Sequence, residues 1–227
     1  MAIFQRARSQ EQRDIRRKSI LDAAAAMLLE MPAAAVTLSE LSRRVGLAKS
    51  NVLRYFESRE AVLLDLLDDA AREWLANQAP HVTAKVEGVV PVGQRIDVVS
   101  ESLANGFAAE PVLSDLLSVQ AAILERNVST QLAMRYRKGV LTSVSGLASL
   151  LSSVLPELDE GHSFDAAKTL ILLVRSIWTE SNPADAMKAA IAQDPSLCMR
   201  NSFAVELKNA FEVVLAGHIA LQHNTLP

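Results

Sequence analysis

Residues 36–56, VTLSELSRRVGLAKSNVLRYF, constrain the fold of this chain more than any other segment. Thr37 and Glu40 have the spacing of a capping box, in which a hydroxyl and a carboxylate satisfy the free amide groups at the start of a helix. Gly46 supplies the positive φ that commonly ends a helix. Between these two signals, apolar residues recur at helical spacing, at Leu38, Leu41 and Val45. The pattern predicts a short helix that ends at Gly46.

A second short helix is predicted directly after this turn. Its apolar anchors are Val52, Leu53 and Phe56. Its other face carries Lys49, Ser50, Asn51, Arg54 and Tyr55. Two short helices joined by a Gly-containing turn, the second rich in hydrogen-bonding side chains, form a helix-turn-helix. The segment therefore indicates DNA binding; an ordinary helical hairpin with a solvated polar face is the alternative.

The charge distribution favours the DNA-binding interpretation. Residues 1–59 contain eleven Lys or Arg and six Asp or Glu, a net charge of +5, although the whole chain carries −3. The positive charge is therefore concentrated beside the predicted motif. Neutralisation of phosphates supplies most non-specific affinity for DNA, so this placement has a physical purpose.

In the order and spacing of its motifs, the segment 13–67 resembles the DNA-binding domain of the TetR family of bacterial repressors. The residues that carry the resemblance are Thr37, Gly46, Tyr55, Phe56, Ser58, Arg59 and the apolar run 61–64. The resemblance implies an all-α protein with an N-terminal three-helix DNA-binding domain at residues 1–57. It also implies a larger helical effector-binding and dimerisation domain at residues 58–227, with a helix at 58–78 linking the two.

The chain departs from the family pattern at three positions. The family usually has Ser before the recognition helix, Gly or Pro early in it, and Tyr three residues before the final Phe. This chain has Ala48, Ser50 and Leu53 there. Because Leu53 lacks a phenol that contacts phosphate, Arg54 is the alternative phosphate contact.

The expected DNA contacts fall into two groups. Lys49, Ser50 and Asn51 open the recognition helix, where side chains face base edges, and Ser39 approaches the groove from the preceding helix. The expected phosphate contacts are Thr37, Arg54, Tyr55 and Arg59. Five further arginines precede the first helix, as a mobile basic arm, or occupy the start of that helix: Arg6, Arg8, Arg13, Arg16 and Arg17.

Composition agrees with an all-α fold. The chain is 50% hydrophobic but only 4% aromatic, with 8 Gly, which disfavours a sheet-rich fold. About ten helices are expected, and the first covers 12–30. After the motif, helices are expected near 58–78, 94–109, 111–126, 129–154 and 163–180, a short one beginning at 182, and a last one at 201–221. Residues 79–93 contain two Pro and two Gly, and we expect a loop there. No membrane span or signal peptide is expected, and Cys198 is the single cysteine, which together suggest a cytoplasmic protein.

No catalytic site, metal site or cofactor is expected. The four histidines are scattered, and none has metal-ligand spacing with another ligand. Gly-rich phosphate loops, nucleophile elbows and HExxH motifs are also absent from the sequence. An enzyme is therefore the weaker hypothesis.

Two apolar helices near the C-terminus are candidates for homodimerisation. Helix 163–180 has a stripe at Ala167, Leu170, Ile171, Val174, Ile177 and Trp178, and helix 201–221 has one at Phe203, Leu207, Ala210, Phe211, Val214 and Leu215. A palindromic operator needs a twofold protein, and two helices from each subunit would form an isologous four-helix interface. The alternative is that both stripes are buried in the core of their own subunit.

Polar residues inside apolar runs are the candidates for an effector pocket. These are Asn105, Gln120 and Arg175, with Trp178 beside them. Each could instead be a satisfied core or interface group, and a buried Arg175 needs an anion from either a ligand or a carboxylate. We expect a hydrophobic effector, with an anionic group as one option. The resulting hypothesis is a repressor released from a palindromic operator by a small molecule; the alternative is a helical architectural protein that binds DNA without an effector.

Overall fold

The computed structural model describes residues 2–197 and 202–223, which form helices and connecting segments with no strand. Ten α-helices are present in these residues: α1 (Ala2–Leu28), α2 (Leu38–Val45), α3 (Lys49–Val52), α4 (Arg59–Val86), α5 (Val92–Ala108), α6 (Pro111–Val119), α7 (Thr130–Val154), α8 (Glu160–Ser181), α9 (Asp185–Gln193) and α10 (Phe203–His223). Short helical turns lie at Ala33–Ala35, Gln120–Leu124 and Pro195–Leu197. The all-α prediction is confirmed. Cys198 lies outside the described residues.

The chain divides into two compact units. The first contains residues up to Asp69 together with Val119–Lys138, and the second contains Ala70–Ser118 and the chain from Gly139 onward. Helices α4 and α7 each begin in the first unit and end in the second.

The core of the first unit joins the helix-turn-helix to α1. Buried side chains come from α1, α2, α3 and the turn after α3, and all are at most 3% exposed: Ile20, Ala24, Met27, Leu41, Val52 and Phe56. Burying a large aliphatic side chain stabilises a fold by about 1.5–3 kcal/mol. These contacts therefore give the short helix α3 a fixed place that its own four residues could not provide.

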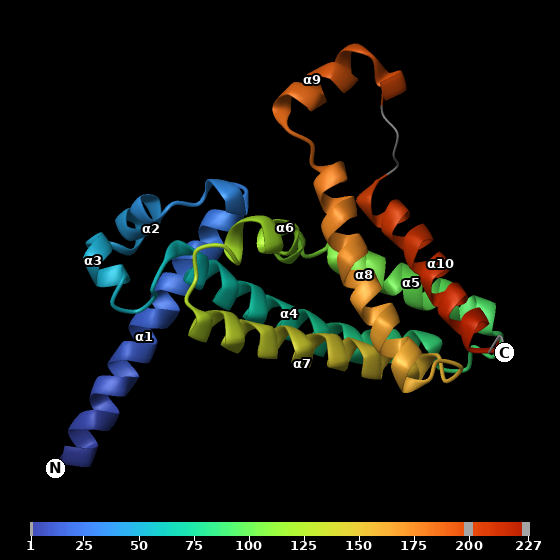
Figure 1. Cartoon of the computed structure of the whole chain (residues 1–227), viewed down its shortest axis with the longest axis horizontal. Coiled ribbons are helices and arrows are strands. Elements are labelled where there is room, and N and C mark those ends of the chain that lie inside the picture. The colour runs from blue at the N-terminus through green and yellow to red at the C-terminus, as the bar shows by residue number, and fades with distance from the viewer. Residues whose placement is uncertain (1, 198–201, 224–227) are drawn as a thin grey trace. The chain divides into compact units, whose positions relative to one another are not determined.

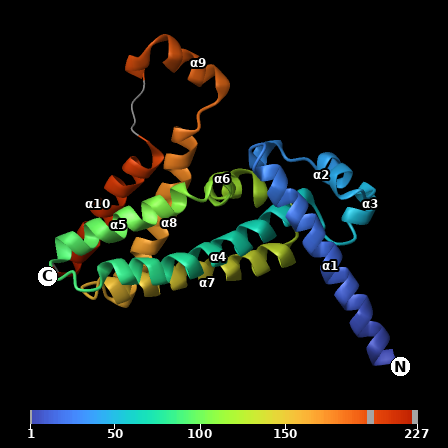
Figure 2. The same cartoon turned by 180° about the vertical axis from the view of Figure 1, so that it is seen from behind.

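The second unit is a helical bundle in which α10 packs against α5 and α8 (Figure 1). Aromatic rings link three of its helices. Trp74 of α4 stacks on Phe107 of α5 with ring centroids 4.0 Å apart, and Phe107 meets Phe211 of α10 edge to face at 6.4 Å. Between α8 and α10 the chain extends outward through α9, which buries no residue (Figure 2).

The expected loop at residues 79–93 is shorter than predicted: α4 continues through Pro80 to Val86, and only residues 87–91 connect it to α5. A proline inside a helix costs about 3 kcal/mol. Val82 and Val86, one turn apart, are 0% and 8% exposed, and burying two valines outweighs that cost at about 1.5–3 kcal/mol each. The helix instead ends before Gly88, whose φ is +77°.

Other boundaries also differ from the prediction. Helix α1 begins at Ala2, so the expected mobile arm is part of a helix. The helix expected at 111–126 ends at Val119 and is followed by a wider π-helical turn. Within the described ranges, no helix has both the length and the apolar character needed to cross a membrane.

Candidate nucleic-acid interface

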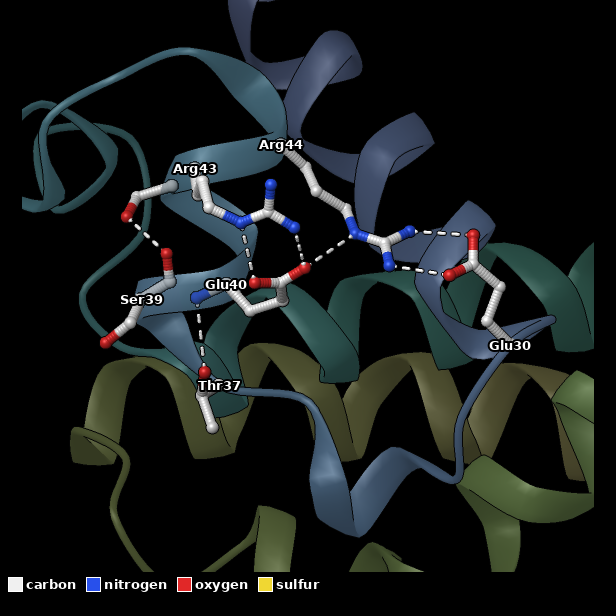
Figure 3. A network of polar contacts seen from close by, with 7 residues as sticks. Glu30, Thr37, Ser39, Glu40, Arg43 and Arg44 are labelled. Carbon is white, nitrogen blue, oxygen red and sulfur yellow. Dashed lines mark hydrogen bonds and ion pairs between the residues drawn. The ribbon is translucent and has the colours of Figure 1, made fainter.

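Helix α2 begins at Thr37, as the sequence predicts. Thr37 has extended backbone angles, and its Oγ1 accepts a hydrogen bond from the Glu40 amide at 3.2 Å. The Glu40 carboxylate is engaged by two arginines: Arg43 donates from Nε and Nη2 at 2.9 and 2.6 Å, and Arg44 donates from Nε at 3.1 Å (Figure 3). The hydroxyl half of the capping box is therefore present, and Glu40 serves the last turn of its own helix.

Arg44 connects α2 to the segment after α1. Its Nη1 and Nη2 donate to the two carboxylate oxygens of Glu30 at 2.8 and 2.6 Å (Figure 3). Hydrogen bonds from Arg43 and then Arg44 lower the pKa of Glu40 to about 2, and the hydrogen bond from Arg44 lowers the pKa of Glu30. At neutral pH both carboxylates are charged, so the network Glu30–Arg44–Glu40–Arg43 orients α2 relative to α1.

The turn between α2 and α3 depends on Gly46. Its φ of 68° and ψ of 31° are left-handed helical values, which L-residues with a Cβ adopt at a cost. The Leu47 amide donates to the Ser42 carbonyl at 3.0 Å, closing the end of α2. This turn sets the direction in which α3 leaves α2, as the sequence predicts.

Helix α3 is anchored on one side and exposed on the other. Val52 is 0% exposed and Phe56 3%. Most of the predicted DNA contacts are exposed: Thr37, Ser39, Lys49, Ser50, Asn51 and Arg54, whereas Tyr55 is half-buried. Leu53, expected as an apolar anchor, is instead 45% exposed at the C-terminal cap of α3.

Arg59 has partners within the protein. Its Nη1 donates to the Val36 carbonyl at 2.8 Å and to the Ala34 carbonyl at 3.4 Å, and its Nε donates to Glu60 at 3.1 Å. The side chain therefore ties the segment before α2 to the start of α4. A phosphate contact by Arg59 would have to compete with these bonds.

Arg17, expected as a phosphate contact at the start of the first helix, instead has partners within the protein. Its Nη1 donates to the Tyr55 carbonyl at 3.2 Å, and its guanidinium lies 4.2 Å from the centre of the Phe56 ring. It also forms an ion pair with Asp65. Arg17 precedes the buried Ile20 by three residues, so its place on the inner face of α1 is a periodic signal that could have identified it.

Helix α7 contacts the segment that follows the recognition helix. Ser129 donates from its amide and its Oγ to Glu57 at 2.6 and 2.7 Å, which lowers the pKa of Glu57. The same hydroxyl accepts from the Leu132 amide at 3.2 Å, so Ser129 caps the start of α7. Arg135 of α7 donates to Asp65 at 2.8 Å.

A basic groove lies beside the end of the recognition helix. It has a volume of about 900 Å³ and is lined by Gln12, Arg13, Ile15, Arg16, Ser19, Arg54 and Tyr55. Three guanidinium groups thus border one open groove. Arginine is suited to such a place because its planar donors match phosphate oxygens in pairs.

The four predicted effector residues have different surroundings. Asn105 is exposed on α5, and Arg175 is half-buried on α8. Gln120 is 1% exposed and donates to Glu125 at 2.7 Å. Trp178 donates to Asp115 at 3.4 Å and lines a pocket of about 440 Å³ near Asn182 and Phe203.

The two predicted dimerisation stripes contribute much of the second unit's own core. Ala167, Leu170, Val174 and Ile177 of α8 are at most 5% exposed, as are Leu207, Phe211 and Leu215 of α10. Large apolar side chains on the outer faces of these helices remain exposed: Leu172, Val205, Val213 and Leu221.

Comparison with known families gives two matches that together span most of the chain. Residues 20–66 match the family described as bacterial regulatory proteins, tetR family, and residues 68–222 match the tetracyclin repressor-like C-terminal domain. The comparison with curated proteins finds no match.

Solved structures with the same fold include a putative TetR-family transcriptional regulator from Mesorhizobium loti, at 15% identity and a TM-score of 0.56, covering 92% of this chain and 97% of that one. The fatty acid degradation regulator FadR from Bacillus halodurans is 16% identical with a TM-score of 0.54, covering 89% and 95%. The FadR repressor of Thermus thermophilus, solved in complex with lauroyl-CoA, is 19% identical with a TM-score of 0.53, covering 88% and 94%.

Proposed function

Because the chain belongs to the TetR family of bacterial transcriptional regulators, we propose that it is a repressor that binds a palindromic operator and is released by a small hydrophobic effector. The observation that carries the DNA-binding part is the exposed start of α3. Lys49, Ser50 and Asn51 project from a helix whose opposite side is fixed by Val52 and Phe56. Rigid anchoring with exposed donors is what base recognition in the major groove requires.

The phosphate contacts in this proposal are the groups around the basic groove. Arg13, Arg16 and Arg54 border it, and Thr37 and Tyr55 lie at the ends of the motif. Contacts of this kind fix the position of the protein on DNA without carrying sequence information.

A homodimer is the assembly that fits a palindromic operator. We place its interface on α8 and α10, on the outer faces that leave Leu172 and Val213 exposed. An isologous contact would bury each of these faces against its copy.

The effector in this proposal binds the larger helical unit. The hydrophobic character of the effector is supported by the T. thermophilus FadR, which binds lauroyl-CoA. Asn105, Arg175 and Trp178 of this unit are the polar and aromatic candidates to contact it, whereas Gln120 lies in the first unit and pairs with Glu125 there. Release requires the effector to bind the state with low operator affinity more tightly, because equal affinity for both states shifts neither population.

Competition between a palindromic site from the chain's own promoter region and random DNA tests this function. Specific regulators prefer their site by about 10³-fold or more at physiological salt. A ratio near one would favour the architectural alternative, in which the chain binds DNA without sequence preference.

A further inference from the structure

The second unit contains buried polar groups that have no hydrogen-bond partner among the described residues. They include Trp74 Nε1 on α4, Gln78 Oε1 one turn later, and Ser102 Oγ on α5. Trp74 is 5% exposed and Ser102 3%. Buried donors and acceptors are almost always paired, because removing them from water without a partner costs free energy. Trp74 and Gln78 are one turn apart on α4, and unpaired groups on one face of a helix are suited to a partner from outside the chain.

At Gly106 the side chain of Gln78 contacts the backbone of α5. A Cβ added at Gly106 would lie 2.6 Å from Cδ of Gln78, so the Gln78 carboxamide rests directly on α5. The next residue, Phe107, stacks on Trp74. Ser102 is one turn before Gly106 and therefore lies on the same face of α5. We name Trp74, Gln78, Ser102 and Gly106 the α4–α5 cluster.

Gln78 fills the space above Gly106 without pairing its own Oε1. The side chain is half-buried and flexible, so it can rotate toward solvent. Pro80, two residues later, has no N–H to donate to the Ala76 carbonyl, and α4 lacks a hydrogen bond beside Gln78. Rotation of Gln78 would open a space bounded by Trp74, Gly106 and Phe107.

We propose that the α4–α5 cluster binds an uncharged, mainly apolar molecule that carries an amide-like group. The indole N–H of Trp74 only donates, and the Oε1 of Gln78 only accepts. A complementary group therefore has both an acceptor and a donor, as a carboxamide does. Phe107 and Phe211 supply apolar walls, at 1% and 0% exposed.

An ionised ligand group is disfavoured at this site. The four members of the cluster carry no charge, so a buried carboxylate would lose its hydration without gaining a counter-ion. The inference rests on the proposed function only in treating this ligand as the effector, in which case the α4–α5 cluster replaces Asn105, Arg175 and Trp178 as its binding site.

Fluorescence of Trp74 tests binding directly. The chain has two tryptophans, and Trp178 is a candidate effector contact, so the emission is followed in the unmodified chain and compared with that of Trp74→Phe, in which the change should be lost. We expect octanamide to change the emission of Trp74 in a saturable way and to bind about tenfold more tightly than octanoate, with calorimetry on the unmodified chain giving the same ratio. Equal affinity for the amide and the carboxylate, or no saturable change with octanamide, would overturn the proposal.

Two Gly→Ala variants of α5 form a matched pair. The added methyl of Gly106→Ala enters the cluster, whereas that of Gly93→Ala meets no atom within 4 Å. We expect Gly106→Ala to weaken octanamide binding by about tenfold and Gly93→Ala to leave it unchanged. If Gly106→Ala does not fold, Gln78→Met removes the acceptor at similar volume and should weaken binding by about fivefold. Unchanged octanamide affinity in the variants of the cluster that fold contradicts the site.

Operator binding by the same variants separates this inference from the proposed function. If octanamide binds in the cluster but operator affinity stays unchanged, the cluster is a binding site but not the effector site. An unmodified chain that binds octanamide but does not prefer the operator over random DNA would instead contradict the proposed repressor.

Discussion

Lys49 and Asn51 are exposed on the first turn of α3, and the buried Val52 keeps that turn in place. Lysine can pair with the acceptors of guanine and asparagine with adenine, at about 1–3 kcal/mol of discrimination for each good contact. We therefore expect Lys49→Ala and Asn51→Ala to weaken operator binding by about tenfold or more while changing binding to random DNA much less. Fluorescence anisotropy with both DNAs measures this ratio.

Lys85→Ala supplies the control. Lys85 is exposed near the end of α4, so this substitution removes the same charge as Lys49→Ala but outside the motif. If Lys49→Ala and Asn51→Ala weakened both kinds of DNA equally, these side chains would not be base contacts.

The lowered pKa of the Glu40 carboxyl predicts how the stability of the fold changes with pH. This pKa is lowered from 4.5 to about 2 in the folded protein by hydrogen bonds from Arg43 and Arg44. A lowered carboxyl pKa stabilises the fold above the unfolded-state value, and this contribution is lost as the pH falls through the folded-state value. Glu40→Gln should therefore lower the Tm near pH 7, and the difference should shrink between pH 4.5 and 2.

Thermal unfolding followed by circular dichroism checks this dependence, with Glu73→Gln on the exposed side of α4 as the control. A Tm difference for Glu40→Gln that stayed constant down to pH 2 would show that the ion pairs of Glu40 contribute nothing to the fold.

At the scale of elements, α1 is long and basic at its start. It begins at Ala2, and residues 2–9 of this helix include Arg6 and Arg8. Each lost phosphate contact reduces the slope of log affinity against log salt by about one unit. Deleting residues 2–9 should therefore lower affinity for all DNA sequences and flatten the salt dependence by up to about two units.

DNA affinity measured across a salt series tests the role of this segment. Lys18→Ala is the control, because the Lys18 ammonium already pairs with Asp22 at 2.8 Å and its removal should leave the slope unchanged. An unchanged slope after the deletion would mean that the start of α1 makes no phosphate contact.

At the scale of the whole molecule, the proposed dimer depends on the outer face of α10. Val213 is 73% exposed there. In an isologous interface, a charge at this position would lie near its own copy and repel it. Val213→Glu should therefore shift the dimer toward monomer in sedimentation velocity and reduce operator affinity. Val90→Glu, at a position 80% exposed between α4 and α5, should leave the assembly unchanged. A Val213→Glu protein that remains dimeric would exclude this face.

The sequence by itself determined the parts of the protein that depend on neighbours along the chain. Thr37 caps α2 through a residue three positions later, Gly46 ends it, and Ser129 caps α7. These signals are local, since a capping bond or a positive φ depends on a few consecutive residues. The helix-turn-helix and the all-α class were predictable for this reason.

Only the tertiary structure decided the contacts between residues far apart in the sequence. Arg17 meets Tyr55 across 38 positions, and Gln78 rests on Gly106 of another helix. Helix α4 continues past Pro80 because Val82 and Val86 are buried, which outweighs the local preference for a break. Proline, arginine and glutamine have the same local character wherever they occur, and their roles here follow from the surfaces that the folded chain packs against them.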